Sequence, residues 1–212
     1  MRLAPLALAM SVLALAACGG GDSPGPTTPP PGTAQKLSTI RFPSNAIALA
    51  AGATKTLAPQ ALDAAGAVIS GASGYTYTSS APAVAELQGD GSVLAIGAGS
   101  STITASLTRD GVTATTTATV TVTGSLPGAA AVTAGASDLT FTPPTIAVAR
   151  NANVTFSFGA LNHSVVFRTV TGAPANVPVT TNGAVVRSFP TAGDFNYDCS
   201  LHAGMSGKVV VR

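Results

Sequence analysis

A thiolate, an imidazole and a thioether occur within seven residues near the C-terminus, at Cys199, His202 and Met205. A second imidazole, that of His163, lies 36 residues upstream on a segment expected to be a separate strand. Two imidazoles, one thiolate and a weak axial thioether are the ligands of copper sites that transfer electrons. Because three donors share one short loop, little of the chain must be ordered for each metal bond. The spacing predicts that the four side chains bind one metal ion.

The types of these donors favour copper over other metals. Thiolate and thioether are soft ligands that suit Cu(I), and imidazole also suits Cu(II). Zinc prefers a tetrahedron of nitrogen, sulfur and oxygen donors and rarely uses a thioether. An iron–sulfur cluster needs four cysteines, and the chain has two. We therefore expect one type 1 copper ion as the cofactor.

Each of these residues also has an ordinary structural reading. A lone His can be a satisfied polar group in a strand, and a lone Met can fill a gap in a core. Here, however, both histidines of the chain belong to the same arrangement. The other cysteine, Cys18, is expected to be lipidated, so Cys199 would have no partner for a disulfide. Copper ligation would explain how this unpaired thiol escapes oxidation.

Short strands must position these ligands. Thr and Val favour strands, Gly and Pro interrupt them, and no segment has a convincing helical period. We expect an all-β chain with two sandwiches, over residues 37–123 and 137–212, joined by a linker over 124–136. In the second sandwich the strands are expected at residues 145–148, 154–158, 164–170, 184–189, 194–199 and 207–212.

Residues 138–212 resemble the cupredoxins of the plastocyanin, amicyanin and pseudoazurin type. The resemblance rests on Phe141-Thr-Pro143, Ile146-Ala-Val148, His163-Ser-Val-Val-Phe167, Phe189 to Cys199, and Met205-Ser-Gly-Lys-Val209. It implies a Greek-key β-sandwich whose copper ligands are His163, Cys199, His202 and Met205. It also implies that His202 lies at the surface, where a redox protein partner would dock.

Three residues depart from the cupredoxin pattern. Ser164 stands where the family often has Asn, and Ala203 stands where Pro is common. The Ser164 side chain could form a shorter and weaker version of the bond that pins the cysteine loop. Asp198 precedes the cysteine in place of an apolar residue, and strand alternation predicts that it faces away from the metal.

The first sandwich, over 37–123, resembles the group 2 bacterial Ig-like domain. The resemblance rests on residues 79–87 and 91–105, and Asp110-Gly111 adds a strong hairpin signal. Its few acidic residues are scattered, and it has no His, Cys or Met. Such domains act as spacers or as adhesive modules, and a spacer is our expectation here.

The N-terminus has the pattern of an export signal. Residues 1–17 contain a minimal positive start at Arg2 and then an apolar stretch that is short for a membrane span. Leu15-Ala-Ala-Cys18 resembles the bacterial lipobox, which implies lipidation of Cys18 and attachment to a membrane. A Pro- and Gly-rich linker follows over 18–36. With Gly19 after the cysteine, the resemblance implies an outer-membrane lipoprotein of the bacterial cell envelope, facing the periplasm or the cell surface.

Composition excludes some functions. Only 8% of residues are charged, the formal net charge is +2, and there is no basic cluster, which argues against nucleic-acid binding. Four protein ligands would leave the metal no open position, whereas catalytic metals usually keep one. No Ser/His/Asp set and no paired-carboxylate cleft is evident either. We therefore predict that the protein is not an enzyme.

Three functions remain open at this point. The first is a monomeric, membrane-tethered one-electron carrier with a redox protein partner. The second is a periplasmic protein that binds copper and delivers it. The third is a surface adhesin in which the Ig-like domain is the active part and the copper domain is structural.

Overall fold

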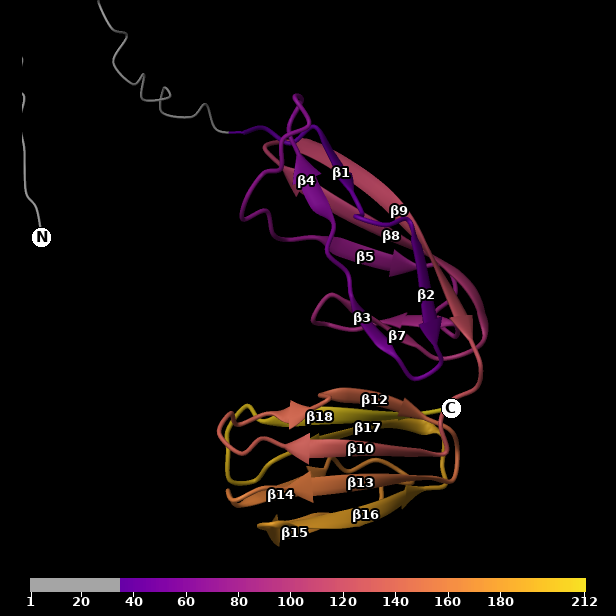
Figure 1. The fold of residues 1–212 in the computed structure, drawn as a ribbon, viewed down its shortest axis with the longest axis vertical. Coiled ribbons are helices and arrows are strands. Elements are labelled where there is room, and N and C mark those ends of the chain that lie inside the picture. Colours follow the sequence, from indigo (N-terminus) through magenta and orange to yellow (C-terminus); the bar gives the residue numbers. More distant parts are fainter. Residues whose placement is uncertain (1–34) are drawn as a thin grey trace, which may run out of the picture. The chain divides into compact units, whose positions relative to one another are not determined.

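The computed structural model describes residues 35–212, and these residues form strands, turns and loops without a helix (Figure 1). The all-β prediction is therefore confirmed. Within the same range there is consequently no helix with the length and hydropathy of a membrane span. The predicted signal 1–17, its lipidation site Cys18 and nearly all of the linker 18–36 lie outside the described residues.

In the described part of the chain, the N-terminal half consists of seven short strands and two long ones, β8 and β9, around an apolar core. A four-stranded sheet has the order β2-β9-β8-β5, a three-stranded sheet has the order β3-β7-β6, and β1 pairs with β4. The strands are β1 (Thr39–Arg41), β2 (Ala46–Ala50), β3 (Thr54–Thr56), β4 (Gln60–Leu62), β5 (Thr76–Ser79), β6 (Ala85–Leu87), β7 (Ser92–Ala95), β8 (Gly99–Arg109) and β9 (Val112–Thr123). Asp110 and Gly111 both have positive φ, 53° and 77°, which suits the expected two-residue hairpin between β8 and β9. The relation to bacterial Ig-like domains stays a prediction.

The C-terminal half contains the predicted ligands and is built from two sheets. Their orders are β11-β10-β13-β16 and β12-β18-β17-β14-β15 (Figure 1). The strands are β10 (Ala129–Ala134), β11 (Phe141–Thr142), β12 (Thr145–Val148), β13 (Ala152–Phe158), β14 (His163–Phe167), β15 (Val177–Thr180), β16 (Gly183–Phe189), β17 (Gly193–Asp198) and β18 (Ser206–Val211). Buried side chains from both sheets form one core cluster.

Strand β10 lies within the segment 124–136, where the sequence predicted a linker. It pairs in parallel with β13 and in antiparallel with β11, and it buries Val132 and Ala134 in the core. Four of its six residues are alanine, which has a low intrinsic preference for strands. Tertiary pairing, which sequence propensity does not report, decides that this segment is a strand.

Aromatic side chains fill the centre of this core. The ring centroid of Tyr197 lies 4.9 Å from that of Phe141 and 5.4 Å from that of Phe156, both in edge-to-face geometry. Such pairs stabilise a core beyond the area they bury. Burial raises the pKa of Tyr197 above that of an ordinary tyrosine. The core also buries further aromatic residues: Phe156, Phe158, Phe167, Phe189 and Phe195.

Candidate metal centre

Two neighbouring strands and one loop bring three of the predicted ligands together. His163 is the first residue of β14, Cys199 directly follows β17, and His202 lies in the loop between β17 and β18. Strands β14 and β17 are antiparallel neighbours, with Phe167 opposite Tyr197. The start of β14 therefore meets the end of β17. There, a cysteine and a histidine 36 residues apart in the chain can bind the same metal ion.

The three donor atoms lie close to one another. Cys199 Sγ lies 3.5 Å from His202 Nδ1 and 3.9 Å from His163 Nδ1, and all three donors lie within 4.8 Å of one another. Two donors about 2.0–2.3 Å from one ion, at trigonal angles, would lie roughly 3.6 Å apart. The arrangement of the side chains therefore fits one nitrogen- and sulfur-ligated metal ion.

The fourth predicted ligand, Met205, is buried at the end of the same loop. It is 2% exposed and belongs to the same core cluster as Cys199. The N–H of Cys199 donates to the carbonyl of Met205 at 2.9 Å, and the N–H of Met205 donates to the carbonyl of His202 at 3.2 Å. These bonds close the loop and keep its three side chains near one another. Coordination by the Met205 sulfur stays a prediction.

His163 is fully buried and is held by a backbone carbonyl from another part of the fold. Its Nε2 lies 2.9 Å from the carbonyl oxygen of Gly135. A carbonyl oxygen can only accept a hydrogen bond, so Nε2 carries the proton in this geometry. The other ring nitrogen, Nδ1, lies 3.9 Å from Cys199 Sγ.

Ser164 links β14 to the cysteine loop. The N–H of Ser200 donates to Ser164 Oγ at 2.9 Å, and the two hydroxyl oxygens lie 2.8 Å apart. Ser164 Oγ is also 3.9 Å from Cys199 Sγ, within reach of a weak hydrogen bond to sulfur. Ser164 thus pins the loop through its short side chain, as the sequence suggested it could.

Asp198 faces away from these donors, as strand alternation predicted. Its carboxylate forms an exposed ion pair with Arg168 at 3.2 Å, while its neighbours Tyr197 and Cys199 are buried. Sequence reasoning did not find the Gly135 carbonyl or Ser200. Every residue has a backbone carbonyl, so residue type does not indicate which carbonyl will accept a hydrogen bond. A serine beside a cysteine is too common to predict a contact.

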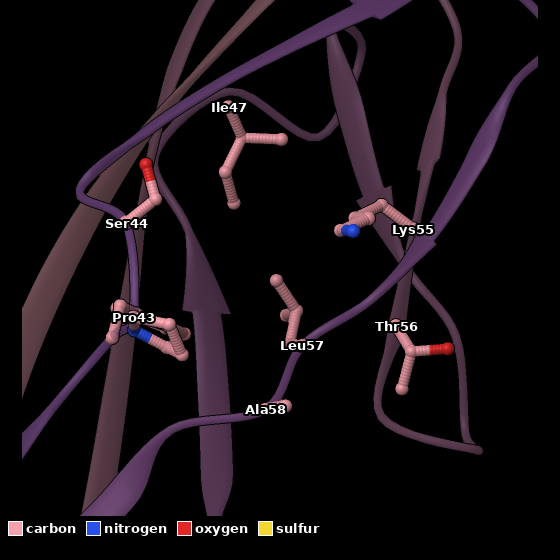
Figure 2. Close-up of a pocket in the computed structure, with 8 residues that line it drawn as sticks. Pro43, Ser44, Ile47, Lys55, Thr56, Leu57 and Ala58 are labelled. Carbon is pink, nitrogen blue, oxygen red and sulfur yellow. The ribbon is translucent and has the colours of Figure 1, made fainter.

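The N-terminal half contains a small cavity of a different chemistry. Its volume is about 190 Å³, and Figure 2 shows Ile47 and Leu57 pointing toward each other across it, with Lys55 alongside. The lining is otherwise apolar or hydroxylated and includes none of the four predicted ligands. The cavity does not contribute to the metal centre.

The chain matches no protein-family model and no curated protein. Among solved structures it is similar to a copper-containing nitrite reductase from Thermus scotoductus, at 23% identity and a TM-score of 0.35, over 43% of this chain and 24% of that chain. Because an enzyme is among the similar structures, the prediction that this protein is not an enzyme does not stand, and enzyme status is left open. A saturated copper site can serve an enzyme whose reaction takes place at another centre, so four ligands do not decide the question.

Two smaller solved proteins match about 40% of this chain. A mutant plastocyanin of fern is 24% identical, with a TM-score of 0.36, over 39% of this chain and 99% of that chain. A mutant amicyanin is 31% identical, with a TM-score of 0.36, over 40% of this chain and 83% of that chain. Solved structures similar to this chain thus include cupredoxins, and the chain itself brings a His163–Cys199–His202 group together.

Proposed function

We propose that the C-terminal sandwich binds one copper ion and carries single electrons to or from a protein partner. The observation that supports this most directly is the convergence of Cys199 Sγ with the Nδ1 atoms of His163 and His202. Thiolate and two imidazoles, with a buried thioether nearby, form the donor set of a blue copper site. The same donors suit zinc and iron less well.

Copper bound by these residues supplies exchange of one electron between Cu(I) and Cu(II). The protein contributes a rigid frame, because the ligands come from paired strands and from a loop closed by backbone hydrogen bonds. Buried His163 excludes water from one side, and Ser164 fixes the cysteine loop. A frame that holds its donors in place limits their movement when the charge of the ion changes, which favours fast electron transfer.

The half-buried His202 is the proposed exit for the electron. Its neighbour Leu201 is 49% exposed, and Leu161, two residues before His163, is 39% exposed. Apolar side chains on loops around an accessible imidazole suit a transient contact with another redox protein, because they need no fixed ion pairs. In this proposal the partner docks at these loops and the protein itself is a monomer.

Copper titration of the full chain tests this function. We expect uptake of one equivalent of Cu(II), an intense visible band from the thiolate, narrow copper hyperfine splitting in the EPR spectrum and reversible voltammetry with copper retained. Absence of stoichiometric copper uptake would overturn the proposal. Ready loss of Cu(I) to a copper chelator would instead support copper delivery, the other function that this donor set allows.

Met205→Leu tests the fourth ligand. Leucine nearly matches the volume of methionine, so packing should change little. We expect copper and colour to be retained through the three stronger donors, while the reduction potential rises. Although the thioether is soft, it is a weak axial donor, and its replacement by hydrocarbon makes the site more apolar, which destabilises the more highly charged Cu(II) more than Cu(I). An unchanged potential in voltammetry would show that Met205 only packs in the core.

We propose further that Cys18 carries lipid and tethers the protein to the bacterial envelope, with the linker 18–36 and the N-terminal sandwich as spacers. The support is the lipobox-like sequence before Cys18. In a Gram-negative host, Cys18→Ala should eliminate incorporation of labelled palmitate and release the protein from the membrane fraction. Continued labelling of this variant would contradict the anchor.

A further inference from the structure

We infer that the turn from Gly135 to Thr140, between β10 and β11, positions His163 for metal binding. The turn provides the carbonyl that holds the histidine ring, and it can do so only because residue 135 has no side chain. The metal-binding part of this inference rests on the proposed copper function. The part that concerns the ring itself does not.

The hydrogen bond to Gly135 fixes the orientation of the ring. Nε2 donates to the Gly135 carbonyl at 2.9 Å, which leaves Nδ1 as the ring nitrogen that can face a metal ion. Nδ1 is also the atom that lies 3.9 Å from Cys199 Sγ, on the side of the donor cluster. Since His163 is 0% exposed, solvent does not compete for the Nε2 proton. The ring is thus prepared for a metal before any metal arrives.

The turn itself is held in place by local bonds and by two strands. The N–H of Gly135 donates to the carbonyl of Thr140 at 2.8 Å, and the hydroxyl of Thr140 donates to the carboxylate of Asp138 at 3.0 Å. On either side, Ala134 of β10 is paired with Phe141 of β11. The Gly135 carbonyl therefore has a fixed position relative to the sheet that it belongs to.

Gly135 cannot accept a side chain without moving this turn. A Cβ added there would overlap both the carboxylate and the backbone oxygen of Asp138. The backbone oxygen cannot swing away as the end of a side chain could, so the turn must shift. A shift of a few tenths of an ångström or more would lengthen or break the bond to His163. Gly135 is in this sense a positioning residue.

Metal-free protein provides the first test, by ¹⁵N NMR of the histidine rings in the full chain. We expect the Nε2 proton of His163 to exchange slowly with water. An Nε2 proton that exchanges as fast as in a free imidazole would overturn the inference. Because this measurement uses the unmutated chain, it holds even if a variant fails to fold.

Gly135→Ala is the second test, with Gly128→Ala as its matched control. Gly128 lies just before β10, and an added Cβ there meets no atom within 4 Å. We expect Gly135→Ala to speed exchange of the Nε2 proton at least tenfold. We also expect it to weaken copper binding about 10- to 100-fold, as loss of a hydrogen-bond partner of a metal ligand does in other metal proteins. Equal effects of the two substitutions would overturn the inference. If the NMR result holds but the unmutated chain binds no copper, then the copper function fails and the positioning of the ring stands.

Discussion

Replacing Cys199 by Ser should abolish the visible colour of the copper-loaded protein. The expected band arises from transfer of charge from the thiolate sulfur to Cu(II). A serine hydroxyl is protonated at neutral pH and gives no such charge-transfer band. Loss of an outer-shell partner alone costs about 10- to 100-fold in metal affinity. We therefore expect loss of the thiolate itself to weaken copper binding by more than about 100-fold. Absorption spectroscopy and a copper titration measure the two effects.

Leu201→Ser is a matched control for this variant. It introduces the same side chain in the same loop, at an exposed position that supplies no donor. Copper stoichiometry and colour should be retained there. A thermal unfolding curve of each metal-free variant separates loss of a ligand from loss of the fold. If copper-loaded Cys199→Ser kept the intense band, Cys199 would not be the source of the charge transfer, and the blue copper assignment would be wrong.

Gly207→Ala should destabilise the C-terminal sandwich by about 3 kcal/mol, the upper part of the range for overpacked cores. Gly207 of β18 lies opposite Tyr197 of β17, and an added Cβ would overlap the end of the tyrosine ring. That ring cannot move aside freely, because Phe141 and Phe156 pack edge-on against it. Since 1 kcal/mol corresponds to about 4–8 °C in a domain of this size, the Tm of the sandwich should fall by roughly 12–24 °C.

Gly183→Ala provides the comparison within the same sandwich. It makes the same chemical change in strand β16, where the nearest atom to an added Cβ is at an ordinary contact distance of 3.6 Å. Its Tm should be nearly unchanged. Tyr197→Leu should partly rescue Gly207→Ala, so that the double variant is less destabilised than the sum of the single variants. Strict additivity of the two would show that the ring and the glycine do not contact each other.

Several strands and one hairpin could be predicted from local sequence because the relevant signals are short-range. The alternation of Val154-Thr-Phe-Ser-Phe158 indicates a half-buried strand, and β13 covers it. The Asp110-Gly111 pair indicates a hairpin, and β8 and β9 meet there. In each case residues adjacent in the chain contain the whole signal.

The candidate site was predictable for a related reason. Metal donors are few in kind, and Cys199, His202 and Met205 lie on one loop, so residue type and spacing are sufficient to predict a metal and to favour copper. The coordination itself, the role of Met205 and the lipid at Cys18 stay predictions. The structure adds that His163 does lie beside Cys199. It also shows that Ser164 forms a hydrogen bond to the cysteine loop, the role that asparagine often has in the cupredoxins.

By itself, the sequence determined the all-β class and predicted the set of metal donors. Only the tertiary structure decided that residues 129–134 form a strand and that the Gly135 carbonyl holds His163, 28 residues away. The physical reason is that these features depend on pairing with β13 and on backbone atoms. Alanines do not specify a strand partner, and every residue has a carbonyl, so neither feature can be recognised before the sheets are assembled.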